Sequence, residues 1–80
     1  MHEANTVRQY LADTGWRARD LARRARVHES ALSHILAGRR RVGRLVALEL
    51  DRATRAAYDA GETSVPPLRL ANHNAARTAA

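Results

Sequence analysis

Three glycines divide the chain into segments whose apolar residues are spaced as in α-helices. Gly15, Gly38 and Gly61 each follow such a segment, and glycine is the residue that most often ends a helix. Before the first of them, apolar residues recur at intervals of three and four and so lie on one side of a helix. This stripe consists of Val7, Tyr10 and Leu11. The spacing predicts a chain built from helices.

The helices can be bounded from their capping residues and their apolar stripes. We expect a first helix capped by Asn5 or Thr6, and three more over about residues 18–25, 29–37 and 44–58. The stripe of the last helix comprises Val46, Leu50, Ala53 and Ala57. Alanine and leucine favour helices, whereas the aromatic residues that favour strands make up only 4% of the chain. The expected fold class is all-α, a compact four- to five-helix bundle.

The composition changes after the fourth helix. We expect residues 1–60 to form the folded domain and residues 61–80 to form a C-terminal tail. The tail contains Pro66-Pro67 and few large apolar side chains, so most of it is expected to be flexible. Residues 65–70 can dock as an extended segment, and a partly docked tail can border a dimer interface.

The small core favours a homodimer. A chain of 80 residues buries little apolar surface, and without cysteine it has no disulfide to supplement that core. Leu45 and Leu48 lie off the apolar stripe of the fourth helix. They either widen the core face or contact a second copy, together with Tyr58 or the tail. We favour the dimer interface for these three residues.

Positive charge is concentrated in the middle of the chain. The net charge is +6, and all 14 basic residues are arginine. Between residues 16 and 45, nine arginines face only Asp20 and Glu29 as acids. Such a cluster is typical of a surface that binds the phosphates of double-stranded DNA. The predicted phosphate-binding residues are Arg17, Arg19, Arg23, Arg39, Arg40 and Arg41.

Residues 18–38 resemble the helix-turn-helix of the phage lambda repressor and Cro family. The matching features are Leu21-Ala22 in the first motif helix, Val27 after the turn, the run Ser30-Ala31-Leu32-Ser33, Ile35 and the closing Gly38. A basic loop (residues 39–41) and Arg52-Ala53-Thr54 in the next helix extend the resemblance, which covers roughly residues 5–58. The tail has no counterpart in that family.

The resemblance implies that the helix beginning near His28 lies in the major groove of DNA. On a helix Leu32 and Ile35 fall about 60° apart and can hold it to the core, which leaves the opposite side exposed. The predicted base-contacting residues are Glu29, Ser30, Ser33 and His34. Glu29 has two open roles, since it either opposes the helix dipole or accepts a hydrogen bond from cytosine.

Three positions depart from the family pattern. Arg26 stands in the turn where glycine is usual, so it must tolerate the turn geometry or the turn must differ locally. His28 replaces the usual Ser or Thr cap of the third helix, and Gly43 replaces a better cap of the fourth. These departures weaken the helix caps and leave the motif assignment intact.

The remaining residues argue against other function classes. His28 and His34 are six apart and point in different directions on a helix, so no metal site is expected, and no cofactor is implied. We find no nucleophile–base or paired-carboxylate pattern, so the protein is not expected to be an enzyme. Without a membrane-spanning or secretory segment, it is expected in the cytoplasm.

The expected function is sequence-specific DNA binding by a dimeric repressor that occupies a palindromic operator. The first alternative is an antitoxin-like or phage-encoded protein-interaction module with the same fold, whose tail binds a partner protein. The second is a nucleic-acid binder without sequence preference, which would bind scrambled DNA equally well.

Overall fold

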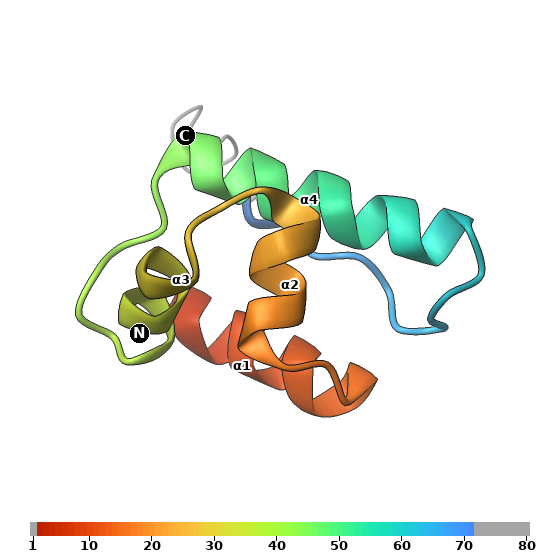
Figure 1. The fold of residues 1–80 in the computed structure, drawn as a ribbon, viewed down its shortest axis with the longest axis horizontal. Helices are drawn as coiled ribbons and strands as arrows, with labels where there is room; N and C mark the ends of the chain where they lie inside the picture. The colour runs from red at the N-terminus through yellow and green to blue at the C-terminus, as the bar shows by residue number, and fades with distance from the viewer. Residues whose placement is uncertain (1, 72–80) are drawn as a thin grey trace.

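The chain folds into α-helices throughout, as the sequence predicts (Figure 1). The computed structural model describes residues 2–71. Within them lie α1 (His2–Thr14), α2 (Ala18–Ala25), α3 (Glu29–Leu36) and α4 (Arg44–Asp59), and no strand. The predicted all-α fold class is confirmed. None of these helices combines the length and the apolar character needed to cross a bilayer.

The core lies between the four helices, where α2 packs against α3 and α4 and α1 packs against α3. Its fully buried large apolar side chains are Val7, Leu21, Leu32, Ile35 and Leu50. Burying one side chain of this kind stabilises a fold by about 1.5–3 kcal/mol. Ala25 of α2 and Ala47 of α4 are also fully buried, and their small side chains let these two helices approach closely.

The first helix begins earlier than the sequence predicts. Asn5 and Thr6 do not cap it, because α1 already begins at His2 and both residues lie within it. Ala4 is buried, at 4% exposure, so it extends the apolar face of α1 by one turn beyond the predicted stripe. Asn5 accepts a hydrogen bond from the Arg8 side chain, at 2.9 Å, rather than capping the helix.

The buried face of α4 also differs from the predicted stripe. It consists of Ala47, Leu50, Ala53, Thr54 and Ala57. The stripe expected from the sequence started at Val46, which is only half-buried, and left out Ala47 and Thr54. Thr54 is buried because residues from beyond α4 fold back over it, and helical periodicity alone cannot reveal such a contact.

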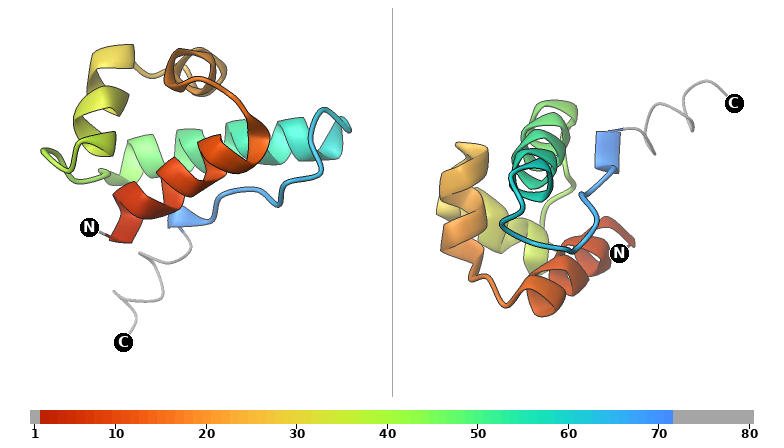
Figure 2. Two further views of the ribbon diagram at one scale, coloured as in Figure 1. Left: turned by 90° about the horizontal axis from the view of Figure 1, so that it is seen from below. Right: turned by 90° about the vertical axis from the view of Figure 1, so that its right-hand side faces the viewer.

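Those residues form a segment, residues 65–71, that we call the strap; it is irregular as far as Arg69, and Leu70 and Ala71 are helical. Figure 2 shows it running between α1 and α4. Leu68 and Leu70 are buried against the core, at 7% and 4% exposure. Residues 65–70 thus dock on the core, as the sequence allowed, but the segment is not extended over its whole length because Leu70 is helical. The flexibility expected of residues 72–80 concerns positions outside the described residues.

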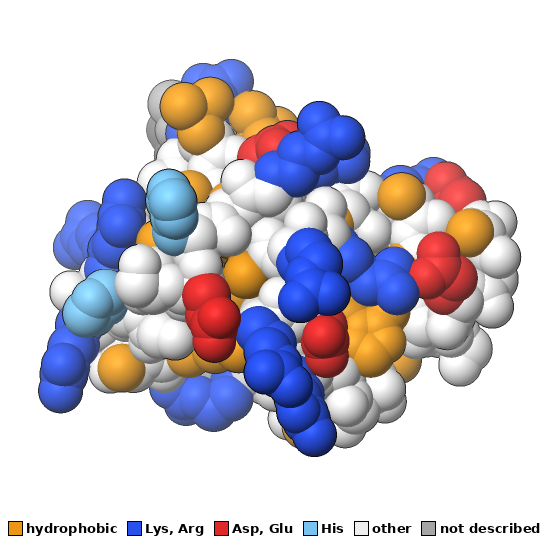
Figure 3. All heavy atoms as spheres, viewed as in Figure 1, with side chains coloured by type: hydrophobic (Ala, Val, Ile, Leu, Met, Phe, Trp, Pro, Cys, Tyr) orange, Lys and Arg blue, Asp and Glu red, His pale blue; other side chains and the backbone are white. Residues whose placement is uncertain are grey.

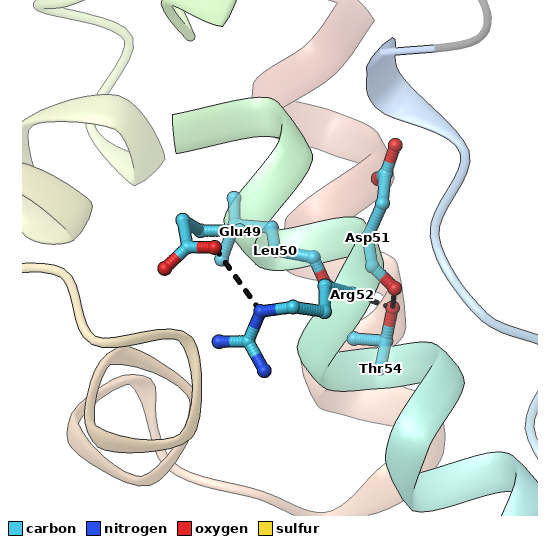
Figure 4. A network of polar contacts seen from close by, with 5 residues as sticks. All are labelled: Glu49, Leu50, Asp51, Arg52 and Thr54. Atoms are coloured by element: carbon cyan, nitrogen blue, oxygen red, sulfur yellow. Dashed lines mark hydrogen bonds and ion pairs between the residues drawn. The ribbon is translucent and has the colours of Figure 1, made fainter. Parts of the chain in front are cut away.

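Two side chains of α4, Asp51 and Thr54, bind the backbone of the strap. Figure 4 shows these two side chains on α4. The Thr54 hydroxyl donates to the Leu50 carbonyl at 2.9 Å and accepts the Leu68 N–H at 3.0 Å. The Asp51 carboxylate accepts the N–H groups of Leu70 and Ala71, both at 2.8 Å. Burial raises the pKa of Asp51, although the two N–H bonds act in the opposite direction. Where the strap closes the core, three of its backbone N–H groups are therefore satisfied by side chains of α4.

Arg26 occupies a backbone conformation that favours glycine. It ends α2 in the left-handed region, with φ 59° and ψ 39°. Its N–H and that of Val27 turn back to the carbonyls of Arg23 and Ala22, at 3.2 and 3.0 Å, which is the Schellman pattern of a helix end. Of the two alternatives that the sequence left open, the first therefore holds: Arg26 adopts the ordinary geometry of the turn, and the turn does not differ locally.

Replacing Arg26 with glycine is expected to stabilise the fold by about 1 kcal/mol, because a left-handed L-residue costs roughly 1–2 kcal/mol that glycine avoids. Thermal unfolding would show this as a rise in Tm of about 4–8 °C. Gly38→Ala is the matched control. Gly38 has φ +76°, and a Cβ atom there would meet no neighbouring atom within 4 Å, so alanine should lower Tm through backbone strain alone. A lower Tm for Arg26→Gly would contradict the strain.

Candidate nucleic-acid interface

The turn between α2 and α3 sets the two helices at a steep angle. In Figure 1, α3 is seen almost end-on while α2 runs within the page. Ala22 of α2, at 2% exposure, provides the small residue that this crossing needs. Val27 in the turn is half-buried and packs against the core. Together α2, the turn and α3 make a helix-turn-helix unit.

The two faces of α3 are cleanly separated. Leu32 and Ile35 are buried, at 0% and 1% exposure, and fix the helix to the core. Every predicted base-contacting residue is exposed: Glu29, Ser30, Ser33 and His34. We call these four the base-contact face. Ser30, Ser33 and His34 project from the side opposite the core, whereas Glu29 lies in the first turn, nearer the side of Leu32. All four side chains are short or polar and exposed, so they are free to enter a groove of DNA.

The N-terminal end of α3 lacks a side-chain cap, as the sequence predicts. His28 is the N-cap residue, in an extended conformation, and its side chain makes no capping hydrogen bond. Glu29 lies in the first turn and is exposed. Its carboxylate therefore lies near the positive end of the helix dipole and also faces solvent, so both of its expected roles remain open.

The predicted phosphate-binding arginines are all exposed. Arg17 precedes α2, Arg19 and Arg23 lie on its outer face, and residues 39–41 form the loop after α3. Figure 3 shows arginine side chains (blue) across α2 and around α3. The ion pairs within residues 2–71 involve Arg24, Arg52 and Arg55, and none of the six predicted residues. Their charges are therefore available to an external anion.

Arg24 differs from its neighbours because the fold itself uses its charge. Its guanidinium carbon lies 4.3 Å from the centre of the Trp16 ring, a cation–π contact. It also forms an ion pair with Glu62 at 2.7 Å, which ties the segment after α4 to α2. Trp16 in turn meets the edge of Tyr10 from α1. Arg24 thus belongs to the packing between α1, α2 and the start of the C-terminal segment.

The three predicted dimer residues are the large apolar side chains that the described fold leaves exposed. Leu45 is 78% exposed, Leu48 46% and Tyr58 44%. All three lie on α4. Of the two roles that the sequence left open for Leu45 and Leu48, widening the core face does not apply to these exposed side chains.

Comparison with known proteins places this geometry in a family. A family model described as a helix-turn-helix domain matches residues 4–67, which is most of the chain. The chain belongs to the helix-turn-helix domain family. No curated protein and no solved structure matches it significantly. The family match agrees with the resemblance seen in the sequence.

A helix-turn-helix domain binds DNA by placing its second motif helix in the major groove while the first crosses the backbone. In this domain α3 and α2 hold those positions. The match also extends past α4 to residue 67, so it includes the first part of the strap. The geometry identifies the protein as a DNA-binding helix-turn-helix domain with its polar α3 face outward.

Proposed function

We propose that this helix-turn-helix domain is a transcriptional repressor that binds a palindromic operator as a symmetric dimer. The observation that carries the proposal is the base-contact face of α3, which is exposed and accompanied by arginines that form no ion pair within residues 2–71. A bound dimer would block polymerase from the promoter. The protein would then need neither a cofactor nor catalytic groups.

The side chains of α3 supply the chemistry that distinguishes bases. Serine hydroxyls donate or accept hydrogen bonds, and the His34 ring can donate to N7 or O6 of a purine. Glu29 can accept from the amino group of cytosine. The arginines of α2 and of the 39–41 loop bind phosphates, which positions α3 along the groove. Affinity thus comes largely from arginine and sequence preference from α3.

The experiment that tests the proposal is selection of bound sequences from random duplex DNA. We expect enrichment of a palindrome whose half-sites are centred about one helical turn, or about 10 base pairs, apart. Enrichment of an unpaired half-site would contradict the symmetric dimer. If the protein retained all sequences alike, the result would favour the alternative of a nucleic-acid binder without sequence preference.

The dimer is supported by the exposed side chains of α4. Leu48 also lines a groove with Pro67 and Leu68, so the strap borders this surface. Burying Leu45 and Leu48 against a second copy would remove from water the most exposed apolar side chains of the described fold. In the alternative function, a protein-interaction module, the tail binds a partner protein. The strap is part of that tail, and it is already packed on the core of its own chain.

Leu45→Glu is expected to shift the protein from dimer to monomer, because a carboxylate would replace an apolar contact at the interface. Sedimentation at roughly tens of micromolar protein, a concentration at which a weak dimer still forms, measures the change. Ala12→Glu on the exposed outer side of α1 is the charge-matched control and should stay dimeric. A monomeric parent, or a dimeric Leu45→Glu variant, would contradict this interface.

A further inference from the structure

The C-terminal end of α3 leaves one backbone carbonyl for a partner outside the helix. The N–H groups of Ala37, Gly38 and Arg39 turn back to the carbonyls of Ser33, Ile35 and His34, at 3.0, 3.0 and 2.9 Å. This Schellman pattern satisfies three of the last carbonyls of the helix. The Leu36 carbonyl takes no part in it.

Arg8 of α1 provides that partner. Its guanidinium donates to the Leu36 carbonyl across 28 positions of sequence. A second nitrogen of the same guanidinium donates to the Asn5 side chain at 2.9 Å, which fixes its direction from within α1. A positive charge at a helix C-terminus also interacts favourably with the helix dipole. The contact is therefore a charge-assisted bond between α1 and the end of α3.

The contact bears on how firmly α3 is held. This helix has only eight residues, and within it Leu32 and Ile35 alone are buried. Both anchors lie on one side, so a further attachment at the helix end limits rotation and tilt about them. The base-contact residues Ser33 and His34 lie within three residues of Leu36. Small shifts of this end would misplace them relative to a base edge.

We infer that Arg8 is a positioning residue for base recognition: it holds the C-terminal end of α3 and thereby sets the orientation of the base-contact face. This inference rests on the proposed function. It separates Arg8 from the arginines that bind phosphate, although Arg8 is exposed as they are. Its effect should accordingly fall on sequence preference rather than on affinity for DNA in general.

The test compares Arg8→Ala, Arg8→Lys and Arg40→Ala on the duplex enriched by selection and on its scrambled version. Arg8→Ala should weaken binding to the enriched duplex roughly tenfold, as expected for one charge-assisted hydrogen bond. It should leave the scrambled duplex and the salt slope unchanged. Arg8→Lys should recover part of the loss, since an ammonium can donate to the Leu36 carbonyl. Arg40→Ala should weaken both duplexes alike.

Equal loss on both duplexes, with a salt slope shallower by about 2 for the dimer, would make Arg8 a phosphate ligand and overturn the inference. Unchanged binding to the enriched duplex would also overturn it. Amide hydrogen exchange of the free protein gives a readout without DNA: Arg8→Ala should speed exchange at Gly38 and Arg39, and unchanged exchange overturns the contact. A parent that prefers no sequence overturns the proposed function instead, which separates the two failures.

Discussion

The affinity of this protein for duplex DNA is expected to fall by about four orders of magnitude between roughly 50 and 200 mM salt. If the arginines around α2 and α3 contact about eight phosphates per dimer, the logarithm of the binding constant should fall with the logarithm of the salt concentration at a slope of about −7. Titration of one duplex across this range measures the slope. The reason is release of the cations that DNA holds along its backbone.

The variants for this experiment separate free arginines from paired ones. Arg40→Ala removes one phosphate contact from each protomer, so it should make the slope of the dimer shallower by about 2 and weaken all sequences alike. Arg52→Ala removes the same charge from α4, where Arg52 is paired with Glu49 at 3.1 Å, and should leave the slope unchanged. A parent slope shallower than about −2 would mean that the arginine cluster contributes little to DNA binding.

Leu70→Ala is expected to destabilise the fold by about 2–5 kcal/mol, as truncation of a buried leucine generally does. Leu70 lies in the strap at 4% exposure, and its N–H is bound by Asp51. A loss of this size is a large part of the free energy of unfolding of a whole domain, which is typically about 5–15 kcal/mol. Urea denaturation measures this loss as a lower midpoint concentration of urea, while the slope of the unfolding free energy against urea concentration stays unchanged.

The neighbouring Arg69 provides the control for the strap. Its side chain is exposed, so Arg69→Ala should change the free energy of unfolding by no more than about 0.5 kcal/mol. If Leu70→Ala and Arg69→Ala behaved alike, the strap would not belong to the core. The expected difference would extend the cooperatively folded unit beyond residue 60, where the composition changes.

The features that the sequence predicts well depend on neighbours along the chain. The bounds of α2, α3 and α4 agree with expectation to within about one residue, the scatter normal for helix ends. Glycines and apolar spacing are local signals, and the exposed face of α3 follows directly from the burial of Leu32 and Ile35. Even the unusual turn at Arg26 could be recognised, because the position lacks its expected glycine.

The features that the sequence does not reveal depend on contacts between distant residues. Thr54 binds Leu68 across 14 positions and Asp51 binds Leu70 across 19, so neither the burial of Thr54 nor the packing of the strap appears in helical periodicity. The early start of α1 has the same origin, because Ala4 is buried only in the assembled core. Composition likewise gave no sign that Arg8 donates to the carbonyl of Leu36 at the end of α3.

Base recognition by α3 is tested most directly by titrating Ser33→Ala and His34→Ala against the selected duplex and its scrambled version at one fixed salt concentration. Both side chains are exposed, so folding should be nearly unchanged. Each variant should lose about 1–3 kcal/mol on the selected duplex per base contact, and up to about twice that in a dimer that uses both half-sites. Binding to the scrambled duplex should hardly change, because phosphate contacts persist. If both variants bind the selected duplex as tightly as the parent, α3 does not recognise the bases and the proposed role of its exposed face is wrong.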